Sequence, residues 1–187
     1  MLNNKKIGFI GSGNMGEALI NGLINSGSSS PENIICSDVK EDRLQHMNDK
    51  YMIQVTTDNT EVVQASDIVI YAIKPQIMAS VLKETAGFLN MSKLIISIAA
   101  GVPMAAIASF LNKELRLIRV MPNVATAVGE GASAIAAGGQ AGEEDIQLAI
   151  EIFNGVSFRQ EKVEERKVAH SPREIAHLHK HYRVSLR

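Results

Sequence analysis

Residues 7–23 read IGFIGSGNMGEALINGL, and this stretch predicts how the first part of the chain folds. A short apolar run leads into a Gly-x-Gly-x-x-Gly turn, after which apolar residues recur at helical spacing as far as Gly27. In a dinucleotide site, Gly11 permits the tight turn, Gly13 lets the backbone approach a pyrophosphate, and Gly16 lets the helix pack close to the strand. The helix start then offers unpaired N–H groups to phosphates. The stretch predicts a nucleotide-binding strand–turn–helix unit, with an ordinary strand–helix connection as the alternative.

The composition is that of a globular protein. The 187 residues are 45% hydrophobic and 21% charged, with a net charge of −1, which suits one domain or one domain with an appendage. No apolar run is long enough to span a bilayer, and the N-terminus leads into a strand rather than a signal peptide, so a cytoplasmic location is expected. The one cysteine, Cys36, lies within an apolar run and is expected to be buried rather than reactive.

Apolar runs of strand length alternate with segments of helical period along most of the chain. The runs are at 7–10, 34–37, 53–55, 68–72, 94–98 and 117–120, and the helical segments are at 14–26, 41–50, 59–65, 76–86 and 103–111. Because the runs are continuous rather than alternating, they suit strands buried on both faces of a parallel sheet. We therefore predict an α/β fold of the Rossmann type, with a doubly wound and mostly parallel sheet. An edge strand at 132–137 and a closing helix entered through Glu143-Glu144-Asp145 complete it.

The character of the chain changes near residue 155. Residues 156–187 carry eight Lys and Arg against four Glu, and they show no sustained hydrophobic period. A capping box at residues 171–174 (SPRE) predicts one short helix, which is marginal without a partner surface. We therefore expect residues 1–154 to form a nucleotide-binding domain and residues 155–187 to form a disordered or loosely helical tail.

Ligands of doubly wound sheets bind at the carboxyl ends of the strands, and an acid follows the second strand. Asp38 stands 22 residues after Gly16, where a carboxylate hydrogen-bonds the ribose hydroxyls of adenosine; a solvated turn aspartate is the alternative. Such an acid favours NAD over NADP because it repels an added phosphate. Lys40 and Arg43 can offset that repulsion, so the cofactor preference stays open.

Three further strand ends bear on the site. Lys74 precedes Pro75 after the fourth strand and is expected to point toward the cofactor mouth. Residues 99–101 (AAG) after the fifth strand leave room for something flat against the backbone, unless they are simply a tightly packed loop. Asn123 after the sixth strand would place an amide at the pocket, with a turn-forming asparagine as the alternative.

Together these strand ends resemble the pyrroline-5-carboxylate reductase family. The matching motifs are, in order, IGFIGSGNMGEALINGL (7–23), AIKP (72–75), SIAAGVP (97–103), RVMPN (119–123) and VGEG (128–131). The resemblance covers about residues 5–154. It implies reduction of Δ1-pyrroline-5-carboxylate to L-proline, the last step of proline synthesis, with NADPH or NADH as hydride donor. It also implies a small-molecule substrate and a homo-oligomer.

Carried over position by position, the resemblance implies cofactor contacts at the glycine turn and at the ends of the second to fifth strands. These residues are Ile10, Gly11, Ser12, Gly13, Asn14, Met15, Gly16, Asp38, Asn59, Ala72, Ile73, Lys74, Pro75, Ala99, Ala100 and Gly101. On the substrate side the resemblance implies Met121, Pro122 and Asn123.

The sequence departs from the family in two places. Family members continue into a long helical domain that dimerises and completes the active site, and nothing in residues 155–187 resembles it. The usual Asn-Thr-Pro is Asn-Val-Ala at residues 123–125. We therefore expect the catalytic residues in that further domain, with little or no activity from this chain alone. We also expect the closing helix to expose apolar surface around Ile146, Ile150 and Phe153.

Other interpretations of the same residues stay open. A β-hydroxyacid dehydrogenase-like oxidoreductase has a similar glycine turn but needs a catalytic lysine on a following helical domain. A non-catalytic NAD(P)-binding module would fit the unusual tail. Nucleic-acid binding by the tail is disfavoured because no aromatic residues interleave with its basic ones. His177 and His181 are one helical turn apart but have no convincing third ligand, so no metal site is expected.

Overall fold

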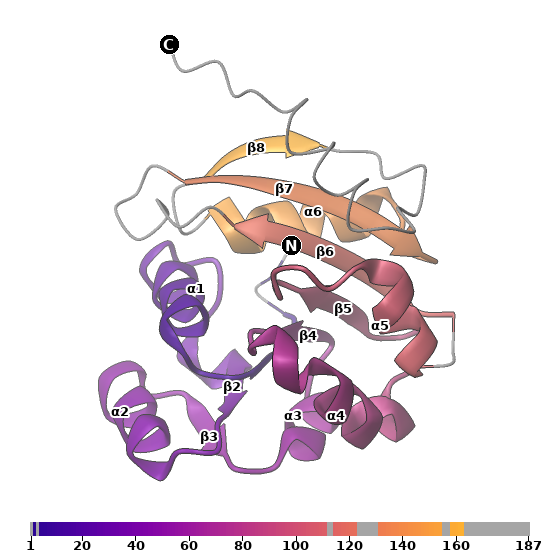
Figure 1. The fold of residues 1–187 in the computed structure, drawn as a ribbon. Coiled ribbons are helices and arrows are strands. Elements are labelled where there is room, and N and C mark those ends of the chain that lie inside the picture. The colour runs from indigo at the N-terminus through magenta and orange to yellow at the C-terminus, as the bar shows by residue number, and fades with distance from the viewer. Residues whose placement is uncertain (1, 3, 112–113, 123–130, 155–157, 163–187) are drawn as a thin grey trace.

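A sheet of eight strands runs through the part of the chain that the structure describes, namely residues 2, 4–111, 114–122, 131–154 and 158–162 of a computed structural model. The strands are β1 (Ile7–Ile10), β2 (Ile34–Ser37), β3 (Gln54–Thr56), β4 (Ile68–Tyr71), β5 (Leu94–Ser97), β6 (Arg116–Pro122), β7 (Gly131–Gly139) and β8 (Phe158–Lys162). Their order in the sheet is β3-β2-β1-β4-β5-β6-β7-β8 (Figure 1). The six strands from β3 to β6 are parallel, β7 is antiparallel to β6, and β8 is parallel to β7. The predicted doubly wound, mostly parallel α/β fold is confirmed.

Helices connect the parallel strands and cover both faces of the sheet (Figure 1). They are α1 (Asn14–Asn25), α2 (Glu41–Tyr51), α3 (Asn59–Ala65), α4 (Pro75–Thr85), α5 (Met104–Leu111) and α6 (Glu143–Asn154), with short 3-10 turns η1 (Pro31–Asn33) and η2 (Ala86–Phe88). Local chemistry sets several of their ends. Pro75 occupies the first position of α4, the Asp58 carboxylate caps α3 by accepting from the Thr60 N–H, and Met52 ends α2 with a left-handed φ of 57°.

Each central strand is buried on both faces, as its continuous apolar run predicts. In β4, Ile68 and Ile70 belong to one hydrophobic core and Val69 and Tyr71 to the other. The first core packs the strands against α1, α2 and α6, and the second packs them against α3, α4 and α5. Cys36 of β2 lies in the first core with no solvent exposure, paired with Phe9 of β1. Burial, helped by the charge of Asp38, raises the pKa of its thiol to about 12.

The far side of the sheet differs from the sequence prediction in two respects. The strand expected at 132–137 is longer, and it is not an edge strand, because β8 pairs along its outer side from Gly131↔Phe158 to Ile135↔Lys162. The five residues of β8 were expected to be disordered or loosely helical, which is wrong for that segment. The physical reason is that β7 would otherwise present unpaired backbone N–H and C=O groups along its outer edge. Residues 163–187, including the predicted capping box, lie outside the described residues.

The closing helix begins with the acidic turn predicted for it, and its third residue is buried. Asp145, 3% exposed, accepts hydrogen bonds from Arg116 at the start of β6, with Nε 3.1 Å from both carboxylate oxygens, and from the Gly142 N–H at 3.0 Å. Burial alone would raise the pKa of Asp145, but these hydrogen bonds outweigh it and lower that pKa. The expected exposed face of this helix is wrong at Phe153, which is fully buried, while Ile146 and Ile150 are partly buried against the same core.

Candidate nucleotide-binding site

The carboxyl ends of the parallel strands meet at one edge of the sheet, where the strand order changes direction between β1 and β4. The chain passes from β1 through α1 to β2 on one side, and β4 lies on the other side of β1. The Gly11 N–H donates to the Ser37 carbonyl at 2.9 Å, and the Ala72 N–H donates to the Ile10 carbonyl at 2.9 Å. The glycine turn is therefore held between the ends of β2 and β4.

Two glycines of the turn are required by close backbone contacts. Gly11 has a φ of 94°, and a Cβ there would lie 2.7 Å from the Ala72 carbonyl oxygen. A Cβ on Gly16 would lie 2.6 Å from the Gly11 carbonyl oxygen, which is the close packing that the sequence assigns to this glycine. Any larger residue at either position would force the first turn of α1 away from the sheet.

Gly13 is different, because a Cβ there would meet no protein atom within 4 Å. Gly13 is the N-cap residue of α1, and no side chain caps the helix start with a hydrogen bond. The first N–H groups of a helix lack intrahelical partners and carry its positive dipole end. Open space beside such a helix start fits a pyrophosphate, so the described residues fit a dinucleotide cofactor.

Asp38 faces the glycine turn from the end of β2. One of its carboxylate oxygens accepts from the Ser12 N–H at 3.0 Å and from the Ser12 hydroxyl at 2.9 Å, and the other accepts from the Lys40 N–H at 3.2 Å. Two donors of Ser12 and one of Lys40 therefore hold the Asp38 carboxylate beside the glycine turn.

Asn59, the first residue of α3, contacts the end of β2 through its side chain. Its side-chain oxygen accepts from the Ser37 hydroxyl at 2.7 Å, and its side-chain nitrogen donates to Glu84 at 3.1 Å. Both ends of the amide are engaged, so the structure places Asn59 as a support for the strand end.

The loops after β4 and β5 lie side by side, because the Ile98 N–H donates to the Tyr71 carbonyl at 3.3 Å. Lys74 is exposed and is the N-cap residue of α4. After β5, the Ala99 N–H lies 3.4 Å from the Ser97 hydroxyl, and Gly101 has a φ of 74°. Residues 99–101 carry no large side chain, so they leave room beside the backbone after β5.

The predicted substrate side is only partly described. Met121, 40% exposed, and Pro122 end β6 on the same edge as the end of β5, paired with Ala134 and Ser133 of β7. Asn123 lies outside the described residues.

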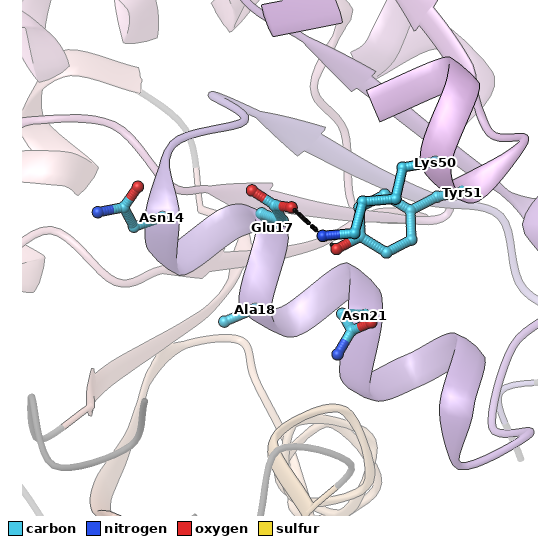
Figure 2. A pocket seen from close by; sticks show the side chains of 6 residues that line it. All are labelled: Asn14, Glu17, Ala18, Asn21, Lys50 and Tyr51. Atoms are coloured by element: carbon cyan, nitrogen blue, oxygen red, sulfur yellow. Dashed lines mark hydrogen bonds and ion pairs between the residues drawn. The ribbon is translucent and has the colours of Figure 1, made fainter. Parts of the chain in front are cut away.

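Glu17 is a residue of this edge that the sequence motifs did not single out. It lies in the first turn of α1 and points toward α2, where one carboxylate oxygen lies 3.0 Å from Lys50 Nζ and 2.9 Å from the Tyr51 hydroxyl (Figure 2). His46 Nε2 lies 3.0 Å from the same oxygen, and Arg43 pairs with the other. These side chains form the Glu17 cluster: Glu17, Arg43, His46, Lys50 and Tyr51. The signal in the sequence is the spacing of Arg43, His46 and Lys50, which puts three basic residues on one face of a helix.

The Glu17 cluster also touches the glycine turn. Arg43 Nε donates to the Ser12 carbonyl at 2.6 Å while its Nη2 pairs with Glu17. Burial would raise the pKa of Glu17, but the surrounding donors outweigh it and hold that pKa far below its ordinary value. Glu17 is thus a fixed negative charge, and Arg43 is engaged on two sides.

The described residues hold neither a metal-ligand cluster nor a membrane-spanning helix. No group of three His, Cys, Asp or Glu side chains there could hold a metal ion. No helix in the described ranges has both the length and the hydrophobicity to cross a membrane. His177 and His181 lie outside the described residues.

The comparisons with known proteins agree with this geometry. A model of the family described as NADP oxidoreductase, coenzyme F420-dependent, matches residues 6–101, from β1 to the loop after β5. The chain belongs to this oxidoreductase family.

Relatives of the chain carry the name that the motifs predict. The chain is 48% identical to the pyrroline-5-carboxylate reductase of Methanosarcina acetivorans over 83% of its own length and 57% of the relative. Among solved structures, it resembles the pyrroline-5-carboxylate reductase of Coxiella burnetii (TM-score 0.83, 31% identity, 88% of this chain and 60% of that one). It also resembles the pyrroline carboxylate reductase of Plasmodium falciparum with NADP bound (TM-score 0.77, 28% identity, 88% and 60%). The resemblance is therefore confirmed, and the chain spans about half the length of the curated relatives it matches.

Proposed function

We propose that residues 1–154 form the NAD(P)-binding domain of a pyrroline-5-carboxylate reductase, which reduces the C=N bond of 1-pyrroline-5-carboxylate to give L-proline. The observation that carries the proposal is the open space at Gly13 beside the uncapped start of α1, at the point where strand order switches. The relatives named for this activity support it.

The residues of the carboxyl edge have separate roles in this proposal. The glycine turn and the start of α1 would hold the pyrophosphate, and Asp38 would hold the adenosine ribose. The small residues at 99–101, next to the end of β4, would accommodate the flat nicotinamide. When bound, the cofactor supplies the hydride, and the protein supplies its orientation.

The substrate would lie beyond the nicotinamide side of the edge, near Met121, Pro122 and Asn123. Turnover needs the substrate and its carboxylate to be positioned, which is a separate requirement from cofactor binding. The proposal includes a small-molecule substrate, a cytoplasmic location and no nucleic-acid partner. The homo-oligomer belongs to the family, whose dimerising helical domain residues 155–187 do not resemble.

Titration of the purified chain with NADH and with NADPH, followed by nucleotide fluorescence, tests the proposal. Saturable binding of at least one of them at micromolar to millimolar concentration is expected. A parallel assay of pyrroline-5-carboxylate reduction measures turnover separately. A folded chain that binds neither nucleotide would overturn the proposed function.

A further inference from the structure

The cofactor preference that the sequence leaves open depends on what Arg43 is free to do. An acid after β2 opposes the 2′-phosphate of NADP, whereas a nearby arginine accommodates it. Asp38 and Arg43 lie on opposite sides of the same residue: the carboxylate accepts from the Ser12 N–H and hydroxyl, and the guanidinium donates to the Ser12 carbonyl. Arg43 is therefore the side chain best placed to change how this edge treats a phosphate.

Glu17 holds the Arg43 side chain in place. Arg43 Nε donates a hydrogen bond to the Ser12 carbonyl and Nη2 donates one to Glu17, and these two bonds fix the plane of the guanidinium. Phosphate recognition by arginine works best through a free pair of N–H groups, and one of the groups in the outer fork is committed to the carboxylate.

The other cations of this edge do not substitute for Arg43. Lys50 binds the same carboxylate of Glu17, so its charge is already paired, and it lines the hollow of about 310 Å³ drawn in Figure 2. Lys40 is exposed at the start of α2, where water and salt screen its charge. Asp38 is the carboxylate that the Ser12 N–H, the Ser12 hydroxyl and the Lys40 N–H hold against the turn itself.

We propose that Glu17 is a specificity-determining positioning residue. By holding Arg43 it keeps the guanidinium from pairing with a 2′-phosphate, so the repulsion between that phosphate and Asp38 is not offset. This chain therefore binds NADH more tightly than NADPH. The proposal rests on the proposed function, because it concerns the same cofactor site. Glu17 acts through Arg43 and is not expected to touch the nucleotide itself.

Dissociation constants for NADH and NADPH, measured by fluorescence titration on the full chain, test the proposal. The wild-type chain is expected to favour NADH. Glu17→Gln keeps the size of the side chain but weakens its hold on Arg43, so the affinity for NADPH relative to NADH should rise about tenfold. The double variant Glu17→Gln/Arg43→Gln should lose that gain.

Two matched controls separate this mechanism from a simple change of charge. Glu17→Gln/Lys50→Gln has the same net charge as the arginine double variant but keeps Arg43, so it should retain the gain. Asp49→Asn removes a carboxylate from the exposed side of α2, where Asp49 bonds to Gln45, and should leave the ratio within about twofold.

Each outcome decides between the two hypotheses. If neither nucleotide binds to the wild-type chain, the proposed function fails. If the wild-type chain favours NADPH, or if NADH binds and Glu17→Gln leaves the ratio unchanged, the function stands and the role of Glu17 is overturned. Equal loss of both affinities in a folded Glu17→Gln chain would show that Glu17 only shapes the turn, and would also overturn it.

Discussion

Two carboxylates of this protein each pair with an arginine between neighbouring elements, and they lie at opposite edges of the sheet. Asp145 pairs with Arg116 at the amino end of β6, where the Asp145 side chain is buried and also accepts a hydrogen bond from the Gly142 N–H. Glu17 pairs with Arg43 at the carboxyl edge, where it is 18% exposed and shares its charge among four side chains. The first pair fastens α6 to the sheet, and the second lies against the turn where a cofactor would bind. The same chemistry therefore fastens a helix at the amino ends of the strands, and at their carboxyl ends it lies at the turn proposed to bind the cofactor.

The largest expected effect separates binding at the carboxyl edge from folding. Gly13→Val places a branched side chain in open space, so the chain should fold normally while nucleotide affinity falls by roughly 100-fold, about 2.7 kcal/mol. Fluorescence titration and thermal unfolding measure the two quantities. Gly87→Val is a matched control, since a Cβ there also meets nothing within 4 Å and lies in η2. Unchanged affinity in folded Gly13→Val would show that the pyrophosphate does not lie at this turn.

The second test is directed at the amino edge. Asp145→Asn keeps the shape of the side chain but leaves Arg116 without its charged partner, so the free energy of unfolding should fall by about 2 kcal/mol. Urea denaturation measures this loss, and the ratio of NADH to NADPH affinity in the folded variant should not move. A changed ratio would mean that the two edges are coupled.

The sequence predicted the strands, the turn and the edge because each depends on local signals. Continuous apolar runs identify buried parallel strands, and Gly11 and Gly16 identify a turn packed against backbone. Glu17 could not be found in this way, because its partners come from α2 and meet it only after the two helices pack on the same face. The strand β8 was missed for a related reason. Its polar, charged sequence carries no strand period, and its pairing depends on the exposed side of β7.

The third prediction concerns the charge at the ribose. Asp38→Ser removes the carboxylate opposed to a 2′-phosphate, so affinity for NADPH relative to NADH should rise about tenfold, or about 1.4 kcal/mol. The same titrations as for Glu17 provide the measurement, and Asp42→Ser, an acid exposed in the first turn of α2, provides the control. If the ratio stays constant while NADH still binds, Asp38 does not hold the ribose.

The smallest expected effect is on the pH dependence of stability. The pKa values of Glu17 and Asp145 are lowered in the folded chain, so the unfolded chain binds more protons as the pH falls below about 4.5. Their stabilisation is complete above that pH and is lost as the pH falls toward the folded pKa values. Glu17→Gln should therefore reduce the acid-induced loss by about 1 kcal/mol in urea titrations between pH 6 and pH 3. An identical pH profile for variant and wild type would argue against a charged Glu17 cluster.

The burial of Cys36 makes the rate of thiol labelling a measure of local opening of the sheet. It is the one thiol in the sequence, it lies in β2 below the end that carries Asp38, and its raised pKa keeps it unreactive at neutral pH. A thiol reagent can therefore modify the protein only when β2 separates from its neighbours, so the labelling rate reports how often this part of the sheet unfolds locally. A nucleotide bound across the ends of β1 and β2 should slow that rate in proportion to its occupancy. Mass spectrometry of the wild-type chain during thiol labelling would then follow cofactor binding without a substrate or a fluorescent signal.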